Sequence, residues 1–338
     1  MQPRAPMEIS RSLRSSNAAP DKICMIEING LTKRYGQHTV VDRLSFSCSA
    51  GEVLGFLGPN GAGKSTTMKM LTGFVTPNSG TASVCGHSIS EAPLAARKHL
   101  GYLPEGAPCY PEMTPRSFLG FIADVRGLAG DRRKGRLDEV IEQLHLGPVL
   151  DQTIDTLSKG FKRRVGLAQA ILHDPDVLIL DEPTDGLDPN QKHEVRELIR
   201  SMSAEKLIVI STHILEEVEA VCSRAIIIAS GKILADDTPA RLAATSRYHN
   251  AVRVTLADEA RFDEVRAALG RLPSVAETES DRARLSITAI ARREDNGVGP
   301  WREISSLVAG KGWDVASVQL EAGRLDEVFR QITKGREA

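Results

Sequence analysis

Apolar residues between positions 23 and 235 fall into short runs that are separated by segments with helical spacing. The first two stretches, 23–28 and 39–49, alternate apolar and polar residues or are rich in β-branched ones, which predicts two antiparallel strands. Later runs are almost entirely apolar, as in strands buried on both faces of a helix-covered parallel sheet. These predicted strands are 52–57, 101–103, 177–180, 207–210 and 225–228. The alternation predicts an α/β fold with a mostly parallel sheet and an antiparallel β edge.

Two further regions depart from this alternation. Residues 115–172 show helical spacing without a strand, which predicts a helical insertion in the α/β core. After Pro239 the order becomes β-α-β-β-α-β plus one helix. The predicted segments are strand 251–256, helix 259–270, strands 274–279 and 283–289, helix 299–310, strand 313–320 and helix 325–333. We therefore predict a disordered tail over 1–22, a larger domain over 23–240 and a small accessory α+β domain over 250–338.

The composition is that of an ordinary globular protein. The chain has 338 residues, of which 41% are hydrophobic and 26% charged, and its net charge of −1 creates no overall attraction to nucleic acid or to an anionic membrane. No apolar run approaches the ~20 residues that span a bilayer, and residues 1–22 lack the apolar core of a secretory signal. The five cysteines are scattered and include no C-x-x-C pair, so we interpret them as reduced thiols of a cytosolic protein, and their spacing argues against a metal site.

A glycine-rich stretch follows the predicted strand 52–57 and precedes an apolar helix. It matches G-x-x-x-x-G-K-[ST], in which backbone N–H groups surround phosphates, the lysine reaches the β- and γ-phosphates and the hydroxyl binds Mg²⁺. A glycine-rich turn can arise by chance, but the strand–loop–helix context favours the phosphate site. The predicted nucleotide-binding residues of this phosphate loop and its helix are Gly58, Pro59, Asn60, Gly61, Ala62, Gly63, Lys64, Ser65 and Thr66.

Ionisable residues stand at the ends of two other predicted strands. Asp181 ends the run 177–180 and suits a Mg²⁺ ligand, and the adjacent Glu182 suits a general base that polarises water. His213 follows the strand 207–210, at the edge of an open α/β sheet where ligands bind. A single histidine at such a position is usually a surface residue, but its place beside the other motifs predicts an approach to the γ-phosphate.

The stretch 156–164 reads TLSKGFKRR and leads into a segment with helical spacing. Ser158 and Gly160 therefore stand at a helix N-terminus, whose free N–H groups suit an anion. The cations of the first turns are mildly unfavourable there, because this end of a helix carries partial positive charge. We interpret Lys162 and Arg163 as part of a solvated face.

Taken in order, these motifs resemble the ATP-binding subunit of an ABC transporter over about residues 25–235. Residues 157–160, here called the signature segment, resemble the signature of that family, and His213 resembles its switch histidine. Asp188, in the Gly-Leu-Asp of 186–188, resembles the loop after the catalytic carboxylate. Tyr35 resembles the aromatic residue that stacks on adenine, although alone it would be read as an aromatic at a strand end.

The resemblance implies ATP and Mg²⁺, the latter bound by Ser65, Asp181 and Glu105. It implies that two subunits pack head to tail, so that each ATP lies between one subunit's phosphate loop and the signature segment of the other. The anion facing Ser158 and Gly160 is then the γ-phosphate of ATP held by the partner. The implied partners are a second copy or a related ATPase subunit and an integral membrane permease, with no nucleic acid. The implied location is peripheral, on the cytoplasmic face of the inner membrane.

Three positions depart from the family pattern. Lys159 and Phe161 replace the usual glycine and glutamine of the signature, while Ser158 and Gly160 keep the phosphate contact. Glu105 stands where the family usually has glutamine. Ionised glutamate only accepts hydrogen bonds and adds negative charge beside ATP, so this position changes the electrostatics of the predicted site.

The Pro-Glu loop at 104–105, the lysine-bearing signature and the C-terminal extension resemble exporter-type subunits, including those of gliding-motility, copper or nitrous-oxide-reductase maturation and drug-export systems. This resemblance implies an ATP hydrolase that dimerises on ATP and drives a separate permease. The alternative is a soluble ABC-type ATPase of DNA repair or translation, but neither a long coiled-coil insertion nor a second ATPase half is present. A P-loop kinase leaves the signature segment and His213 unexplained. The cargo is not readable, because specificity lies mainly in the permease.

Overall fold

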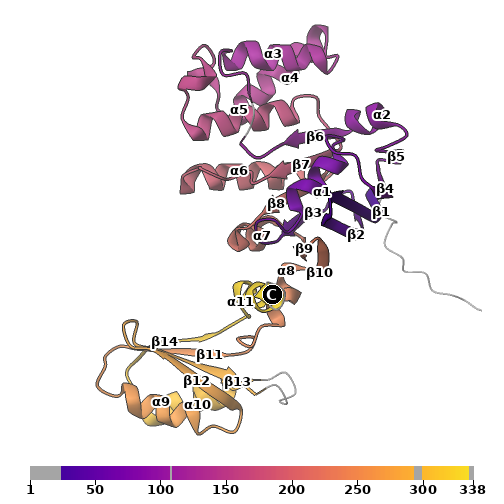
Figure 1. Ribbon diagram of the computed structural model, residues 1–338. Coiled ribbons are helices and arrows are strands. Elements are labelled where there is room, and N and C mark those ends of the chain that lie inside the picture. Colours follow the sequence, from indigo (N-terminus) through magenta and orange to yellow (C-terminus); the bar gives the residue numbers. More distant parts are fainter. Residues whose placement is uncertain (1–23, 107–108, 293–298, 335–338) are drawn as a thin grey trace, which may run out of the picture.

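The computed structural model describes residues 24–106, 109–292 and 299–334. The predicted disordered tail over 1–22 lies outside these residues. Figure 1 shows two parts: a larger one with α3 and α4 at its far end, and a smaller one that carries the last four strands. Helices α8 (Pro239–Ala244) and α11 (Leu325–Lys334) lie between them.

A six-stranded sheet forms the centre of the larger part, in the order β10-β9-β3-β8-β7-β6. Its strands run parallel except β10, which is antiparallel to β9. The bounds are β3 Val53–Leu57, β6 Leu100–Leu103, β7 Val177–Asp181, β8 Leu207–Thr212, β9 Arg224–Ala229 and β10 Lys232–Asp237. Strands β3, β7 and β8 are buried at every position, which explains why their sequences are apolar throughout.

A second, antiparallel sheet in the order β2-β1-β4-β5 forms the predicted β edge. Its strands are β1 Cys24–Tyr35, β2 His38–Ser49, β4 Ser79–Val84 and β5 His87–Ser88. The paired β1 and β2 confirm the antiparallel prediction, although β1 runs on to Tyr35. Strand β4 was not predicted, because the residues of its sequence, SGTASV, are mostly small or polar. Strand β10 was not predicted either, since half of its residues are charged.

Helices cover both faces of the parallel sheet and build the predicted helical insertion. They are α1 Lys64–Leu71, α2 Pro93–Lys98, α3 Pro115–Val125, α4 Gly130–Gln143, the 3₁₀ turns Gly147–Val149 and Ile154–Thr156, α5 Lys159–Ile171, α6 Pro189–Met202 and α7 Leu215–Val221. One face of β7, with Leu178 and Leu180, packs in a core with residues of α3 to α6. The other face, with Val177 and Ile179, packs with α1 and the antiparallel sheet. The predicted α/β fold class is therefore confirmed.

The smaller part is a four-stranded antiparallel sheet in the order β12-β13-β11-β14 with two helices. Its elements are β11 Val252–Leu256, α9 Phe262–Gly270, β12 Val275–Asp281, β13 Ser286–Ala291, α10 Trp301–Lys311 and β14 Val315–Leu320. It has its own core, which includes Phe262, Ile304 and Trp313. The order of elements follows the predicted β-α-β-β-α-β pattern, and the predicted α+β class of this part is confirmed.

The last helix belongs, by its packing, to the larger part. Leu325 of α11 shares an apolar cluster with Leu242 of α8 and Leu57 of β3. Phe329 and Ile332 pack against the same cluster. The predicted boundary between 240 and 250 stays a prediction, but it separates α11 from the apolar cluster of the larger part to which Leu325 belongs.

Candidate nucleotide site

The phosphate loop joins the carboxyl end of β3 to the amino terminus of α1, and glycine is required at two of its positions. Gly63 caps α1 with φ +103°, in the left-handed region that side chains disfavour. A Cβ on Gly63 would lie 2.6 Å from the carbonyl oxygen of Val40, and one on Gly58 would lie 2.4 Å from that of Ile228. Backbone packing thus holds this loop close to the sheet, with its N–H groups at the start of a helix, where an anion is favoured.

Lys64 is buried inside its own loop. Its ammonium group donates hydrogen bonds to the carbonyl oxygens of Gly58 at 2.6 Å and Pro59 at 3.1 Å. Burial lowers the pKa of Lys64, and the negative charges of Glu182, Asp181 and Glu105 oppose that shift. Lys64 begins the helix after β3 and Asp181 ends β7 in the same parallel sheet, so the predicted base and metal ligand lie at the same sheet edge as the phosphate loop.

Asp181 ends β7 and is only 2% exposed. Its Oδ2 atom is buried and has no hydrogen-bond partner in the described part of the chain. A buried, unsatisfied carboxylate oxygen is costly unless a cation or water completes it. A carboxylate oxygen and the Ser65 hydroxyl are oxygen donors of the hard type that Mg²⁺ prefers, so the chemistry of these residues fits that ion.

Glu182 adopts an unusual backbone conformation, with φ +50°, and is held from two sides. Its backbone N–H donates to the carbonyl oxygen of Ser211 at 2.8 Å. Its carboxylate accepts a hydrogen bond from Thr212 at 3.1 Å and lies 2.8 Å from Nδ1 of His213. The strand-end residues of β7 and β8 thus fix the direction of this carboxylate, as a general base requires. Thr212 is not among the residues predicted for the site.

The signature segment forms the amino terminus of α5 as predicted. The hydroxyl of Ser158 caps the helix by accepting the N–H of Phe161 at 3.3 Å. Gly160 lies beneath the side chain of Gln191, and a Cβ added there would stand 2.5 Å from its Oε1 atom. Among the described residues, no hydrogen bond joins Ser158 or Gly160 to the phosphate loop of the same chain.

Arg163 corrects the interpretation of a solvated cationic face. It is only 5% exposed and donates hydrogen bonds to main-chain carbonyl oxygens at the ends of β6 and β7. The acceptors are Pro104 at 3.2 Å, Pro183 at 3.3 Å, Asp181 and Glu182. The signal was present in the sequence, because Arg163 precedes the buried Leu167 by four residues and so shares its helix face.

The remaining predicted residues lie at the periphery of the site. Tyr35 ends β1 and is 52% exposed, with the Lys33 ammonium group 5.1 Å from its ring centroid, so one aromatic surface is open for stacking. Glu105 is exposed and acts on Lys64 through its charge. Asp188 caps α6 by accepting the N–H of Gln191 at 2.9 Å. Its carboxylate is therefore engaged in its own helix cap.

No helix among the described residues combines the length and the apolar character that crossing a membrane requires.

Comparison with known proteins gives a consistent result. The family model "ABC transporter" matches residues 41–185. The Nod factor export ATP-binding protein I of Paraburkholderia xenovorans is 40% identical over 221 residues, which cover 65% of this chain and 73% of that protein. The probable multidrug ABC transporter ATP-binding protein YbhF of Escherichia coli is 39% identical over 223 residues, covering 66% and 38%. A solved ATP-binding subunit of an ABC transporter superposes with a TM-score of 0.62 at 31% identity, covering 65% and 92%.

Proposed function

This chain belongs to the ATP-binding proteins of ABC transporters, and from that premise we propose that two copies close around two ATP molecules and drive export through a separate permease. The chain is an ATPase subunit that acts in transport. The comparisons give no support to the alternative role in DNA repair or translation. The observation that carries the proposal is that Lys64 follows β3 while Asp181 and Glu182 stand at the end of β7, at the same edge of one parallel sheet.

Each of these residues has a distinct chemical role in the proposed hydrolysis. The phosphate loop binds the β- and γ-phosphates through its N–H groups and Lys64. Asp181 and Ser65 would hold Mg²⁺, which neutralises charge on the phosphates. Glu182 accepts a proton from the water that attacks the γ-phosphate, and His213 keeps this carboxylate in position. Glu105 adds negative charge to the surroundings of Lys64.

The signature segment supports a site that is shared between two copies. Ser158 and Gly160 are at the start of a 13-residue helix whose N–H groups favour an anion, yet neither residue contacts the described phosphate loop of its own chain. A second copy in head-to-tail arrangement supplies the missing phosphate. In this proposal Tyr35 stacks on adenine. Asp188 accepts the N–H of Gln191, whose side chain covers Gly160 of the signature segment.

A groove in the larger part provides a surface for the membrane partner. It has a volume of about 830 Å³ and lies between the end of α1, α2, β6 and the helices α3 and α4. Phe74 and Leu94 are each 73% exposed on it, and its cations include Arg97 and Arg132. We assign this groove to an apolar and acidic cytoplasmic segment of the permease, which keeps the chain peripheral on the cytoplasmic face of the inner membrane.

A test of the shared site uses two lesions in two arrangements. Lys64→Ala disables the phosphate loop. Ser158→Asp keeps the helix cap, because aspartate caps as well as serine, but places a carboxylate against the incoming phosphate. In the trans arrangement, each chain of a mixed dimer carries one lesion, so one site receives both lesions and the other is intact. One occluded ATP per mixed dimer is expected.

The cis arrangement is the matched control. One chain carries both lesions and its partner is wild type, so each shared site contains one lesion and no ATP is occluded. If each chain instead built a complete site alone, the results would reverse, with occlusion in cis and none in trans. Differently tagged subunits allow purification of the mixed dimer. The neutral cap Ser158→Asn separates the effect of charge from that of the hydroxyl.

A further inference from the structure

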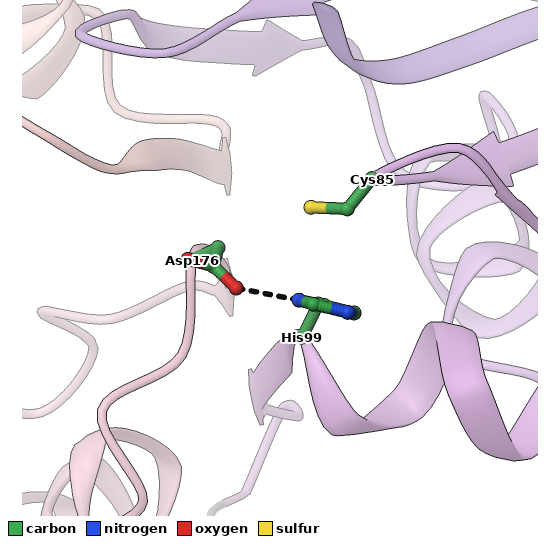
Figure 2. Close-up of side chains that lie close together, drawn as sticks. All are labelled: Cys85, His99 and Asp176. Atoms are coloured by element: carbon green, nitrogen blue, oxygen red, sulfur yellow. Dashed lines mark hydrogen bonds and ion pairs between the residues drawn. The ribbon is translucent and has the colours of Figure 1, made fainter.

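Three potential metal ligands from separate segments meet at a point that the transport mechanism does not use. Figure 2 shows Cys85, His99 and Asp176 facing one another. One ligand atom from each residue lies within 4.8 Å of the other two, and Nδ1 of His99 lies 2.6 Å from Oδ2 of Asp176. Sequence spacing did not reveal this cluster, because its members are 14 and 77 residues apart along the chain and two of them are not cysteines.

The backbone fixes the relative positions of these residues. His99 and Asp176 immediately precede the neighbouring parallel strands β6 and β7, and the carbonyl oxygen of His99 accepts the N–H of Val177 at 3.0 Å. Cys85 stands in the two-residue turn between β4 and β5, and its N–H donates to the carbonyl oxygen of Met25 at 2.8 Å. The three residues thus stand directly beside strands of two different sheets, and backbone hydrogen bonds hold two of them in place.

The turn that carries Cys85 is not one that favours cysteine. Cys85 has φ +47° and Gly86 has φ +77°, so both central residues lie in the left-handed region. Two-residue turns of this kind favour asparagine or aspartate followed by glycine, and an ordinary side chain there costs about 1 kcal/mol or more. Local turn geometry therefore gives no reason for a thiol at this position.

A second histidine stands beside the cluster. The ring of His87, on β5, stacks on that of His99 with centroids 5.3 Å apart and an angle of 17° between the planes. His87 is partly buried, and a rotation of its side chain would bring a ring nitrogen toward the same centre. The group therefore offers sulfur, nitrogen and oxygen donors, with a further imidazole in reach.

The location separates this group from the nucleotide site. His99 and Asp176 lie at the amino-terminal ends of β6 and β7, whereas the phosphate loop, Glu105 and Asp181 lie at the carboxyl ends of parallel strands in the same sheet. The cluster therefore stands at the sheet edge opposite to the phosphate loop. His99 follows the end of α2, and Cys85 precedes β5, and both elements are labelled in Figure 1.

We propose that Cys85, His99 and Asp176 form a binding site for Zn²⁺, with His87 or water as the fourth ligand. A mixed thiolate, imidazole and carboxylate set is typical of Zn²⁺, whereas Mg²⁺ prefers oxygen donors alone. Tetrahedral ligands of zinc lie roughly 3.3–3.8 Å apart, so small side-chain rotations convert the observed arrangement into a coordination sphere. On binding, the Cys85 sulfhydryl loses its proton to solvent and its sulfur bonds to zinc. The ion then ties the antiparallel sheet to the parallel one.

Zinc retention by the full chain, prepared without a histidine tag, tests the proposal. The protein is incubated with Zn²⁺ in excess Mg²⁺ without nucleotide, dialysed and analysed for metal. One zinc per chain is expected. The variant Cys85→Asn suits the left-handed turn but lacks the thiol, and Asp176→Asn keeps the shape but lacks the charge. Each is expected to weaken zinc binding tenfold or more, while thermal unfolding without metal confirms that both variants fold.

The control and a spectroscopic measurement identify the ligand. Cys109→Ala, at a partly buried cysteine outside the cluster, is expected to retain one zinc. With Co²⁺ as the probe, wild type and Cys109→Ala should show thiolate-to-cobalt charge-transfer absorption that Cys85→Asn lacks. Less than one zinc in the wild-type chain, or equal binding by Cys85→Asn, would overturn the proposal and leave only a surface ion pair between His99 and Asp176.

Discussion

Nε of Arg163 lies 3.3 Å from the main-chain oxygen of Pro183, so the helix of the signature segment is hydrogen-bonded to the segment that carries Asp181 and Glu182, the proposed metal ligand and general base. The same guanidinium also reaches Pro104, beside Glu105. Burial lowers the pKa of Arg163, and nearby carboxylates, Asp185 first, oppose that shift. We predict that Arg163→Met lowers the free energy of unfolding by at least ~2 kcal/mol, because buried carbonyl groups lose their donors. The rate of ATP hydrolysis should also fall, because the main chain at Glu182 loses a hydrogen bond that holds it in position.

Lys162→Met is the matched control, since Lys162 is the preceding residue and its side chain donates to the main-chain oxygen of Asp155 at 2.8 Å, the one hydrogen bond of that side chain within the described residues. Its stability should change by less than ~1 kcal/mol. Denaturant unfolding and steady-state hydrolysis measure the two effects. Equal behaviour of both variants would show that the contacts of Arg163 do not position the catalytic segment.

A second prediction concerns the base. Glu182→Gln keeps the side-chain shape and can still accept the hydrogen bond from Thr212, but it cannot take a proton from water. Hydrolysis should slow by ~10²-fold or more while ATP binding persists, so ATP-bound dimers accumulate. Single-turnover hydrolysis and gel filtration with ATP measure both outcomes.

Asp181→Asn separates the role of the metal ligand from that of the base. It leaves Glu182 intact but weakens the proposed Mg²⁺ site, so ATP binding should lose its dependence on Mg²⁺. For the preceding prediction, a wild-type rate of hydrolysis in Glu182→Gln would show that Glu182 is not the general base.

The strands at the centre of the fold were predictable because burial on both faces demands apolar residues, as in the VLILD of 177–181. Strand β4 was not, because its pairing with β1 is made by backbone groups, and a small polar sequence carries no such signal. The packing of α11 was also not predictable, since its apolar spacing shows that one face is buried but not against which neighbour.

The site divides in the same way. The phosphate loop, Asp181, Glu182 and His213 follow strand ends in one sheet, so sequence order alone places them at one edge. Arg163 was misread because charge was taken as a sign of exposure, whereas carbonyl groups at strand ends can satisfy a buried guanidinium. The meeting of Cys85 with Asp176 depends on contact between two sheets, which local sequence does not encode.

A third prediction concerns acid. Burial, together with Arg126, lowers the pKa of His173 from 6.5 to about 4, and its ring contacts the main-chain oxygen of Leu100 at 3.0 Å. The unfolded chain therefore binds a proton between pH 6.5 and 4 that the folded chain does not. The free energy of unfolding should fall as pH decreases through this window, by about 1–2 kcal/mol between pH 7 and 5 from this residue.

His173→Gln tests that contribution, because glutamine supplies a donor for Leu100 but does not titrate. Urea unfolding at pH 7 and pH 5 should show a smaller loss of stability in the variant than in the wild type. An identical loss in both proteins would mean that His173 does not contribute to acid sensitivity.

The last prediction separates α11 from the strands that precede it. Residues 250 and 251 pair with Glu321. The N–H of Asn250 donates to the carbonyl oxygen of Glu321 at 3.0 Å, and the N–H of Glu321 donates to the carbonyl oxygen of Ala251 at 2.8 Å. A short glycine linker can therefore replace residues 252–320 and leave α11 on its apolar cluster. This excised protein should bind ATP and unfold near the wild-type temperature. Ending the chain after Glu321 should instead lower the free energy of unfolding by roughly 3–5 kcal/mol, because Leu57 and Leu242 lose their cover.

The stability of these variants shows to which part of the protein α11 belongs. If residues 250–338 formed one accessory unit, the excised protein would be no more stable than a chain ending at 245, since α11 alone would add nothing. If α11 completes the ATP-binding part, the excised protein has a higher free energy of unfolding than both the chain ending at 245 and the chain ending at Glu321. Gly323→Ala supplies a point variant of the same contact, because Gly323 has φ +111° and a Cβ there would overlap the main-chain oxygen of Ala243. Its unfolding should shift toward that of the chain ending at Glu321, and a wild-type midpoint would contradict the role given to α11.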